Sequence, residues 1–299
     1  MARITERPVE QASERAWASE DVGNIHFLEH VNVTQPDQAL ATLFYIVGMG
    51  FTRDPYLNVG LQNMWVNLGE QQFHLPTREP QVIPGHIGIV VPDLAALEAR
   101  LAAVQPALAH TRFSYRVEPD HVAVTCPWGN TFRCYAPHPR FGDMLLGMPY
   151  VEFLTRPGTA AGIARFYEQA LGAPARVDSD AGGPAARVAI GTHQWLTFRE
   201  TDAPLRPYDG HHIAIYVANF SGPYAFFQAR GRIMEDVTNH QFRFKDLVDP
   251  ATDEVVFTLE HEVRSLHHPM YRRPLVNRDP AQAQMRYRRG RDALVPYVG

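Results

Sequence analysis

The chain has 299 residues, enough for one large domain or two ordinary ones at about 150 residues each. Hydrophobic residues make up 45 % and charged residues 20 %, which is typical of a globular protein and argues against a disordered chain. With 28 Lys and Arg against 32 Asp and Glu, the formal charge of −4 gives no overall basic field for nucleic acid. No apolar run reaches the roughly 18 residues of a membrane span, and the opening residues lack the apolar core of a secretory leader. We therefore expect a cytoplasmic protein that binds a small molecule and neither nucleic acid nor membrane.

An internal repeat divides the chain. Phe44-Tyr45 followed by Gly50 recurs, at one constant offset, as Phe166-Tyr167 followed by Gly172. The apolar run His86-Ile87-Gly88-Ile89 has a counterpart in His212-Ile213-Ala214-Ile215. We predict a tandem duplication with one unit over residues 25–140 and a second over residues 147–265.

The first unit begins with an apolar strand from His30 to Val33. Asp37 then starts a helix in which four apolar residues recur at helical spacing: Leu40, Leu43, Phe44 and Val47. A second strand, His86 to Val91, leads to Asp93 as the N-cap of another helix, whose apolar face carries Leu94, Leu97, Leu101 and Val104. Short strands separated by Gly and Pro turns are expected over residues 63–68, 72–75, 122–126 and 131–135.

The second unit repeats this plan. Thr159 is the expected cap of a helix that carries Ile163, Phe166 and Tyr167, and Ser221-Gly222-Pro223 opens the helix of Phe226 and Phe227. Each unit then contains two modules, and each module consists of a strand, a helix and three further strands. The sequence therefore predicts an α+β fold of four βαβββ modules arranged as two tandem domains.

The two ends of the chain fit no module. Residues 1–24 are polar and are expected to form an N-terminal arm, and residues 266–299 a C-terminal arm. The C-terminal arm carries arginines but no lysine, so it either packs on the acidic body or on a second subunit, or binds an anionic partner. Cys126 and Cys134 flank a Pro-Trp-Gly turn and are expected to be reduced.

The second unit offers a set of metal ligands at strand positions: Glu152, His212 and Glu260. Glu152 lies within an apolar strand, where a carboxylate is costly to bury unless a cation compensates its charge. Two carboxylates and an imidazole suit Fe²⁺, Mn²⁺ or Zn²⁺ with coordination positions left open for substrate. If the register of the last strand shifts by one residue, Glu262 or His261 takes the place of Glu260.

The first unit offers a possible second metal site at His30, His74 and His86, and three histidines can hold a metal ion. Its last strand carries Arg133, whose fixed positive charge would oppose a cation and favours an empty pocket or an anion. We therefore expect the second unit to hold the ion.

Two further histidines could act on a substrate instead of binding the ion. His240 lies on a strand with alternating polarity and could serve as a general acid or base. His193 is near the proposed ligands in the sequence and is a weaker candidate for the same role. For both, a structural position at the surface or the edge of the core is the alternative.

The repeated motifs resemble the vicinal oxygen chelate superfamily, which includes glyoxalases, bleomycin-resistance proteins and type I extradiol dioxygenases. The resemblance covers residues 25–265 and is carried by EHVNV with FYIVGMGF, GHIGIVVPDL with CPWGNTFRCY, YVEF with FYEQALG, and GHHIAIYV with FTLEHEV. It implies paired βαβββ modules that form a cup around one divalent ion. Members of this length with two domains resemble extradiol dioxygenases, which hold iron through two histidines and a glutamate. His212 and Glu260 match two of these ligands, whereas Glu152 stands where the first histidine is expected.

Three functions follow from the residues and the resemblance. The first is a metal-dependent enzyme, with Fe(II) the leading ion and Mn(II) or Zn(II) as alternatives, that acts as a dioxygenase on a small aromatic or enolisable substrate chelating the metal through two adjacent oxygens. The second is a lyase or isomerase of glyoxalase type, in which a carboxylate moves the proton. The third is a metal-free binding protein of the bleomycin-resistance type. A homo-oligomer is expected in each case.

Overall fold

The computed structural model describes residues 21–54, 62–238 and 240–277, and these residues form the four expected βαβββ modules. The first module contains β1 (Ile25–Asn32), α1 (Gln38–Ala41), the π-helix η2 (Thr42–Gly48), β2 (Thr52–Arg53), β3 (Asn63–Leu68) and β4 (Gln71–Pro76). The second contains β5 (Gly85–Val90), α2 (Leu94–Leu108), β6 (Ser114–Val117), β7 (Val122–Thr125) and β8 (Thr131–Tyr135). After the 3-10 helix η3 (Pro139–Phe141), the third contains β9 (Gly147–Thr155), α3 (Ala160–Leu171), β10 (Ala175–Asp180), β11 (Gly183–Gly191) and β12 (Gln194–Glu200). The fourth contains β13 (His212–Val217), α4 (Ser221–Gln228), β14 (Glu235–Thr238), β15 (Gln241–Val248) and β16 (Val255–Ser265).

The strands form two sheets of eight, and each sheet takes one module from each sequence unit. The first sheet has the order β14-β15-β16-β13-β1-β4-β3-β2, so it joins the first and fourth modules. The second has the order β10-β11-β12-β9-β5-β8-β7-β6 and joins the second and third modules. The two sequence units are therefore not two separate sheets. The opening strands of the modules pair across units, β1 with β13 and β5 with β9, both antiparallel.

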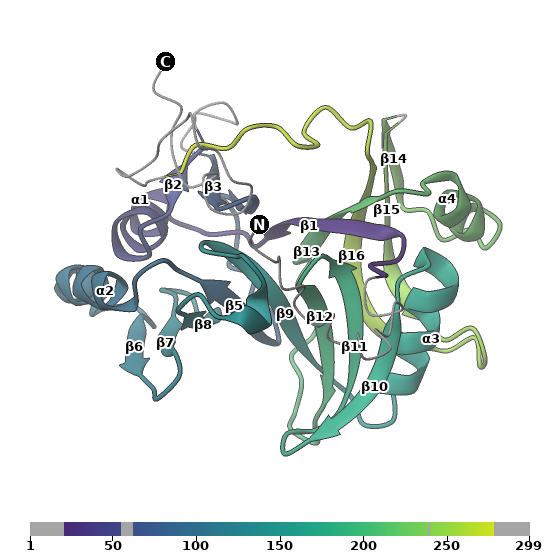
Figure 1. The fold of residues 1–299 in the computed structure, drawn as a ribbon, viewed down its shortest axis with the longest axis horizontal. Coiled ribbons are helices and arrows are strands. Elements are labelled where there is room, and N and C mark those ends of the chain that lie inside the picture. Colours follow the sequence, from purple (N-terminus) through teal and green to yellow (C-terminus); the bar gives the residue numbers. More distant parts are fainter. Residues whose placement is uncertain (1–20, 55–61, 239, 278–299) are drawn as a thin grey trace, which may run out of the picture.

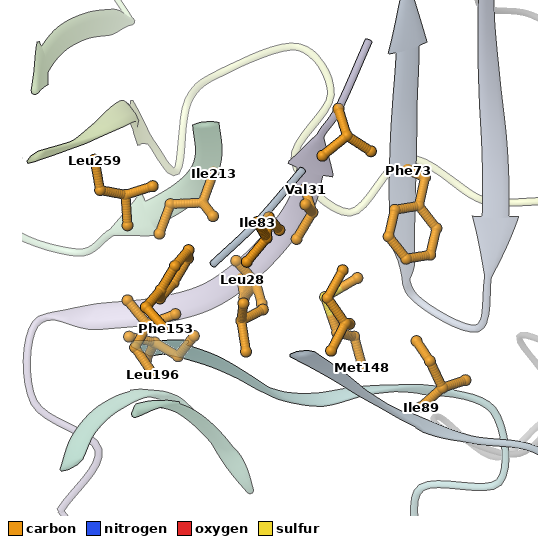
Figure 2. Packing of buried hydrophobic residues seen from close by; sticks show 14 of the residues in the cluster. Leu28, Val31, Phe73, Ile83, Ile89, Met148, Phe153, Leu196, Ile213 and Leu259 are labelled. Carbon is orange, nitrogen blue, oxygen red and sulfur yellow. The ribbon is translucent and has the colours of Figure 1, made fainter. Parts of the chain in front are cut away.

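One hydrophobic core joins the two sheets (Figures 1 and 2). Alternation of side chains along each strand sends one apolar row inward, and Leu28 and Val31 of β1 lie near Phe153 of β9 in this core. The rings of Phe73 and Phe132 connect the sheets on one side, with centroids 5.9 Å apart. The helices lie at the two ends, α1 and α2 at one and α3 and α4 at the other. The opposite face of each sheet is left for polar side chains.

Helical spacing predicted the first helix but not its geometry. The Asp37 side chain caps α1 by accepting from the backbone N–H groups of Ala39 and Leu40, as expected. The helix then widens into η2, in which each turn takes more residues than in an α-helix. Val47 consequently leaves the apolar face and is 46 % exposed, whereas Tyr45 is buried in its place.

The helix caps of the other modules follow the sequence in part. Asp93 caps α2 by accepting from the Ala96 N–H, as predicted. Thr159 precedes α3 but does not cap it, because its hydroxyl is bound to Thr155 and to the Arg156 carbonyl. The Glu200 carboxylate accepts from the Ala160 N–H instead, at 2.8 Å, so a strand of the same module supplies the cap.

Two expectations about membrane and thiols can be compared with the fold. Within residues 21–54, 62–238 and 240–277, no helix combines the length and the apolar character needed to cross a membrane. Cys126 and Cys134 are both buried and form no disulfide, as expected for reduced thiols.

The first part of the C-terminal arm, residues 266–277, crosses the molecule as a strap (Figure 1). The Asn277 side chain binds both backbone groups of Gly69, at 3.1 and 2.9 Å. Arg273 binds the buried carboxylate of Asp54 at 2.6 Å. The strap therefore connects the end of β16 to the β3–β4 turn and packs on the body of the protein. Residues 278–299 of the arm, and residues 1–20 of the N-terminal arm, lie outside the described residues.

Gly69, which the strap covers, should be far less tolerant of substitution than Gly158. Both have a positive φ, +65° and +79°, so alanine costs each of them about 1–2 kcal/mol of backbone strain. A Cβ on Gly69 would also lie 1.9 Å from the Leu146 carbonyl oxygen, whereas a Cβ on Gly158 meets nothing within 4 Å. We expect Gly69→Ala to lower the free energy of unfolding by about 1–3 kcal/mol more than Gly158→Ala in urea titrations. Equal losses would show that the backbone at Leu146 moves aside without cost.

Candidate metal centre

Four strands of the first sheet bring polar residues into register on its open face. Asn32 of β1 lies opposite His74 of β4 on one side and His212 of β13 on the other. His212 in turn lies opposite Glu260 of β16. The neighbouring row contains Gln72, His30, Ala214 and Glu262, again from β4, β1, β13 and β16. Residues two apart on a strand share a face, so both rows point to the same side.

Three imidazoles converge on this face. One nitrogen each of His30, His74 and His212 lies within 4.8 Å of the other two. The His30 ring is 5.8 Å, centroid to centroid, from both other rings. The Nε2 atom of His30 and both nitrogens of His74 are buried and have no hydrogen-bond partner. Buried polar groups are almost always bonded, so these nitrogens fit a missing shared partner such as a metal ion.

Packing fixes the orientation of two of the three rings, those of His30 and His74. The Trp65 indole stacks on His74 at 4.0 Å between centroids and meets His30 edge-on at 4.8 Å. Trp65 is itself 8 % exposed, so it forms a rigid wall behind both rings. These two imidazoles are therefore held in place without the ion.

Glu29 orients the His30 ring through a hydrogen bond. Its carboxylate lies 2.6 Å from His30 Nδ1, which fixes that nitrogen and leaves Nε2 directed at the cluster. The strand pairing between β1 and β13 shifts register between Leu28 and His30, and this bulge turns Glu29 to the same side as its neighbour. A carboxylate behind a histidine is the usual second partner of a metal ligand.

His30 and His74 are neutral at physiological pH. Burial lowers the pKa of His74 to about 2, and the adjacent His30 and His212 add to the shift. Burial also lowers the pKa of His30, against the opposing effect of Glu29. Neutral imidazole is the form that binds a metal, so these two ligands need not lose a proton before they bind.

Two carboxylates stand beside the histidines. Glu262 Oε1 lies 3.2 Å from His212 Nε2, and Glu260 Oε1 lies 3.9 Å from His212 Nδ1. Burial alone would raise the pKa of Glu262, but the hydrogen bond with His212 and the proximity of His30 and Arg264 outweigh it and hold that pKa well below its ordinary value. Glu262 is therefore a negative charge near the cluster.

A cavity of about 360 Å³ opens onto the cluster, and its lining includes His74, His212, Glu260, Arg78 and Arg243. The remaining lining is largely polar and includes Asn32, Thr34, Asn63 and Gln81. The site is thus a polar pocket with imidazoles and a carboxylate at its base. A pocket of this size holds a small organic molecule.

The ligand set expected from the second unit is not assembled. Glu152 lies on β9 of the second sheet, opposite His86 of β5, whereas His212 and Glu260 lie on the first sheet. Its carboxylate is bound by Arg199 at 3.2 Å and lies 3.5 Å from His86, so the Arg199 guanidinium compensates its charge. The expected ligands are separated because strands of different units pair, which divides the ligands of each unit between two sheets.

The set expected from the first unit is divided in the same way. His30 and His74 join His212 in the cluster, but His86 lies on the second sheet. Burial lowers the pKa of His86 to about 3, with further lowering by Arg133 and Arg199, so it is a neutral histidine among arginines. Its Nε2 lies 3.1 Å from the Tyr150 hydroxyl.

The two histidines expected to move protons lie away from the cluster. His193 is an exposed residue in the β11–β12 turn, where it packs against Gly142. His240 lies in the turn directly before β15 and not on the strand expected for it, its carbonyl accepts from the Ser265 N–H, and it is near His268 of the strap. Neither lines the pocket.

Sequence reasoning missed the residues that support the cluster: Glu29, Arg243 and Arg264. Arg264 is buried and binds Glu29, and it also binds Glu262 at 2.7 Å. Glu262 was an alternative to Glu260, and both face the site because they are two residues apart on β16. His261 points the other way, and its Nε2 lies 2.8 Å from the Tyr167 hydroxyl. A run of charged residues within an apolar strand is the signal that could have found this network.

The comparisons with known proteins place the fold. No protein-family model and no curated protein matches the sequence. Among solved structures, the chain is similar to glyoxalase I from Zea mays, with a TM-score of 0.56 and 14 % identity over 83 % of this chain and 94 % of that one. It is also similar to a candidate dioxygenase from Bacillus subtilis subsp. subtilis str. 168, with a TM-score of 0.54 and 12 % identity over 81 % of this chain and 86 % of that one. With its four βαβββ modules in two mixed sheets, the chain has the fold of the vicinal oxygen chelate superfamily.

Proposed function

We propose that the chain is a metal-dependent enzyme that acts on a small substrate bound to a divalent ion through two adjacent oxygens. The observation that carries the proposal is the convergence of three imidazoles, of which His30 and His74 have buried nitrogens without a hydrogen-bond partner. His30, His74 and His212 would hold the ion, and Glu260 is the nearest carboxylate that also lines the pocket. When bound, the ion would lower the pKa of a substrate hydroxyl and fix the two oxygens.

The pocket supports an anionic substrate. Arg78 and Arg243 both line it, and the other polar groups there can accept or donate hydrogen bonds. A catecholate or an enediolate presents two adjacent oxygens, and a carboxylate on the same molecule would supply a separate negative charge. The protein would bind the oxygens at the base of the pocket and the charge at its arginines.

The leading reaction is that of a dioxygenase. His30, His212 and Glu260 together supply two histidines and one carboxylate, the set typical of non-haem Fe(II) oxygenases. Fe(II) is therefore the proposed ion, with Mn(II) and Zn(II) as alternatives. The polar pocket leaves room for substrate beside the ligands.

A glyoxalase-type lyase or isomerase is the second candidate, and His74 favours it. A fourth protein ligand leaves fewer positions for a second reactant, and Glu260 beside the pocket is placed to move a proton of the substrate. Such a reaction needs no oxygen. The two candidates therefore differ in one measurable requirement.

Metal binding and oxygen consumption test the proposal. Protein stripped with chelator should gain several degrees in Tm when Fe²⁺, Mn²⁺ or Zn²⁺ is added well above its Kd, because binding to the folded state alone stabilises it. Turnover should then be sought with catechols and with α-hydroxycarbonyl compounds in an oxygen electrode. Oxygen uptake matched to product supports the dioxygenase, and undiminished turnover under argon supports the lyase. A Tm that none of the three ions shifts would contradict metal dependence.

A further inference from the structure

We infer that Arg243 holds Glu260 away from the metal until an anionic group of the substrate replaces that carboxylate on the guanidinium. The inference rests on the proposed function, since it needs an ion at the histidines. It assigns Arg243 as a positioning residue and the substrate as an anion.

Arg243 bridges the two carboxylates of the site. It lies on β15 opposite Glu262 of β16. Its Nη1 is 2.7 Å from Glu260 Oε1, and its Nη2 binds Glu262 Oε1. One guanidinium therefore fixes both glutamates that stand beside His212.

The two carboxylates are held unequally. Glu262 has two other neighbours, the Arg264 guanidinium at 2.7 Å and the His212 imidazole at 3.2 Å, and its side chain is 3 % exposed. Among the described residues, Glu260 has one ion-pair partner at hydrogen-bond distance, Arg243, and its side chain is 15 % exposed. Glu262 would thus stay in place if Arg243 moved, whereas Glu260 would be released.

The pocket exposes this ion pair to an incoming ligand. Arg243 and Glu260 both line the cavity, and the Arg243 side chain is 24 % exposed. An anion entering there can replace Glu260 on Arg243 Nη1, because it offers the same kind of charged acceptor as that carboxylate. The released Glu260 carries one negative charge, which a divalent ion held by neutral imidazoles attracts. Substrate binding and completion of the metal site would then occur together.

Removing Arg243 should tighten metal binding, which a merely structural role would not do. We expect Arg243→Gln to lower the Kd for Co²⁺, measured by its visible absorption in titrations, about tenfold because Glu260 is freed. Adding Glu260→Gln to this variant should cancel the gain, and Arg243→Lys should restore the wild-type Kd in part. Thermal unfolding without metal checks that each variant is folded. An unchanged or raised Kd in Arg243→Gln overturns the inference.

The substrate's charge is tested with acetate against neutral acetamide. Acetate should tighten Co²⁺ binding to the wild type but not to Arg243→Gln, and acetamide should change neither. Equal effects of acetate on both proteins overturn the exchange at Arg243. Absence of Co²⁺ binding by the wild type and by Arg243→Gln contradicts the proposed function itself, and the inference fails with it.

Discussion

His74→Ala should abolish stoichiometric metal binding. Both ring nitrogens of His74 are buried without a partner, so its imidazole has no other bond to keep it in place as a structural group. Loss of a direct ligand should weaken binding at least as much as loss of an outer-shell partner, roughly 100-fold or more. Elemental analysis of protein purified without a histidine tag, and Co²⁺ titration, measure the loss. The fold should persist, since His74 lies at the pocket and the buried residues of β4 from Gln71 to Phe73, and Leu75, are unchanged.

The matched controls are His86→Ala and Glu152→Ala. Both residues lie on the second sheet, where Glu152 is bound by Arg199 and neither joins the three-histidine cluster. Each should keep the metal content of the wild type. Metal loss in these two variants, together with full metal occupancy in His74→Ala, would show that the ion binds at the second sheet and not at the three histidines.

The module order could be predicted from the sequence because it depends on local signals. Asp37 and Asp93 cap their helices as the pattern predicts, and apolar alternation marks the strands. These signals act within a few residues. The π-helix was not predictable in this way, because Val47 has the spacing of a buried residue and is exposed only through the wider turn.

Which modules share a sheet could not be predicted. The repeat shows that β1 and β9 are equivalent and that β5 and β13 are equivalent, but it does not say which pairs form. Both pairings place similar apolar strands side by side, and only the packing of the whole chain decides between them. The structure pairs β1 with β13 and β5 with β9.

This pairing of modules explains why the predicted ligand sets differ from the observed cluster. His30, His74, His212 and Glu260 were all recognised as ligand types, but they were divided between two expected sites. Glu29 was not recognised, because in a regular strand it would point away from His30 and towards the core. The bulge between Leu28 and His30 reverses that direction, and no residue in this segment is a strong bulge signal.

Arg264→Met should destabilise the metal-free protein by about 3–5 kcal/mol at pH 7, because it leaves the buried Glu29 carboxylate without its arginine and Glu262 with Arg243 alone. The Arg264 side chain is 6 % exposed and binds Glu29 and Glu262, which are 6 % and 3 % exposed. Burial raises the pKa of Glu29, but the charge of Arg264 and the hydrogen bond with His30 together lower it by more than burial raises it. The pKa of Glu29 in the folded protein therefore lies below the ordinary 4.5. The pKa of Glu262 is also held well below 4.5.

The pH dependence of this loss follows from the direction of the two shifts. A carboxyl group whose pKa is lowered by folding adds stability above its unfolded pKa and loses it as the pH falls through the folded pKa. The difference between wild type and Arg264→Met should therefore be full at pH 7 and shrink below about pH 4.5, as the Glu29 and Glu262 carboxylates become protonated. Urea unfolding in the presence of chelator, at pH 7 and at pH 4, measures both values.

Arg176→Met removes an exposed pair with Asp178 and should cost far less stability at either pH, because water already screens that pair. Equal losses in the two variants would show that the buried network adds no more to stability than a surface ion pair.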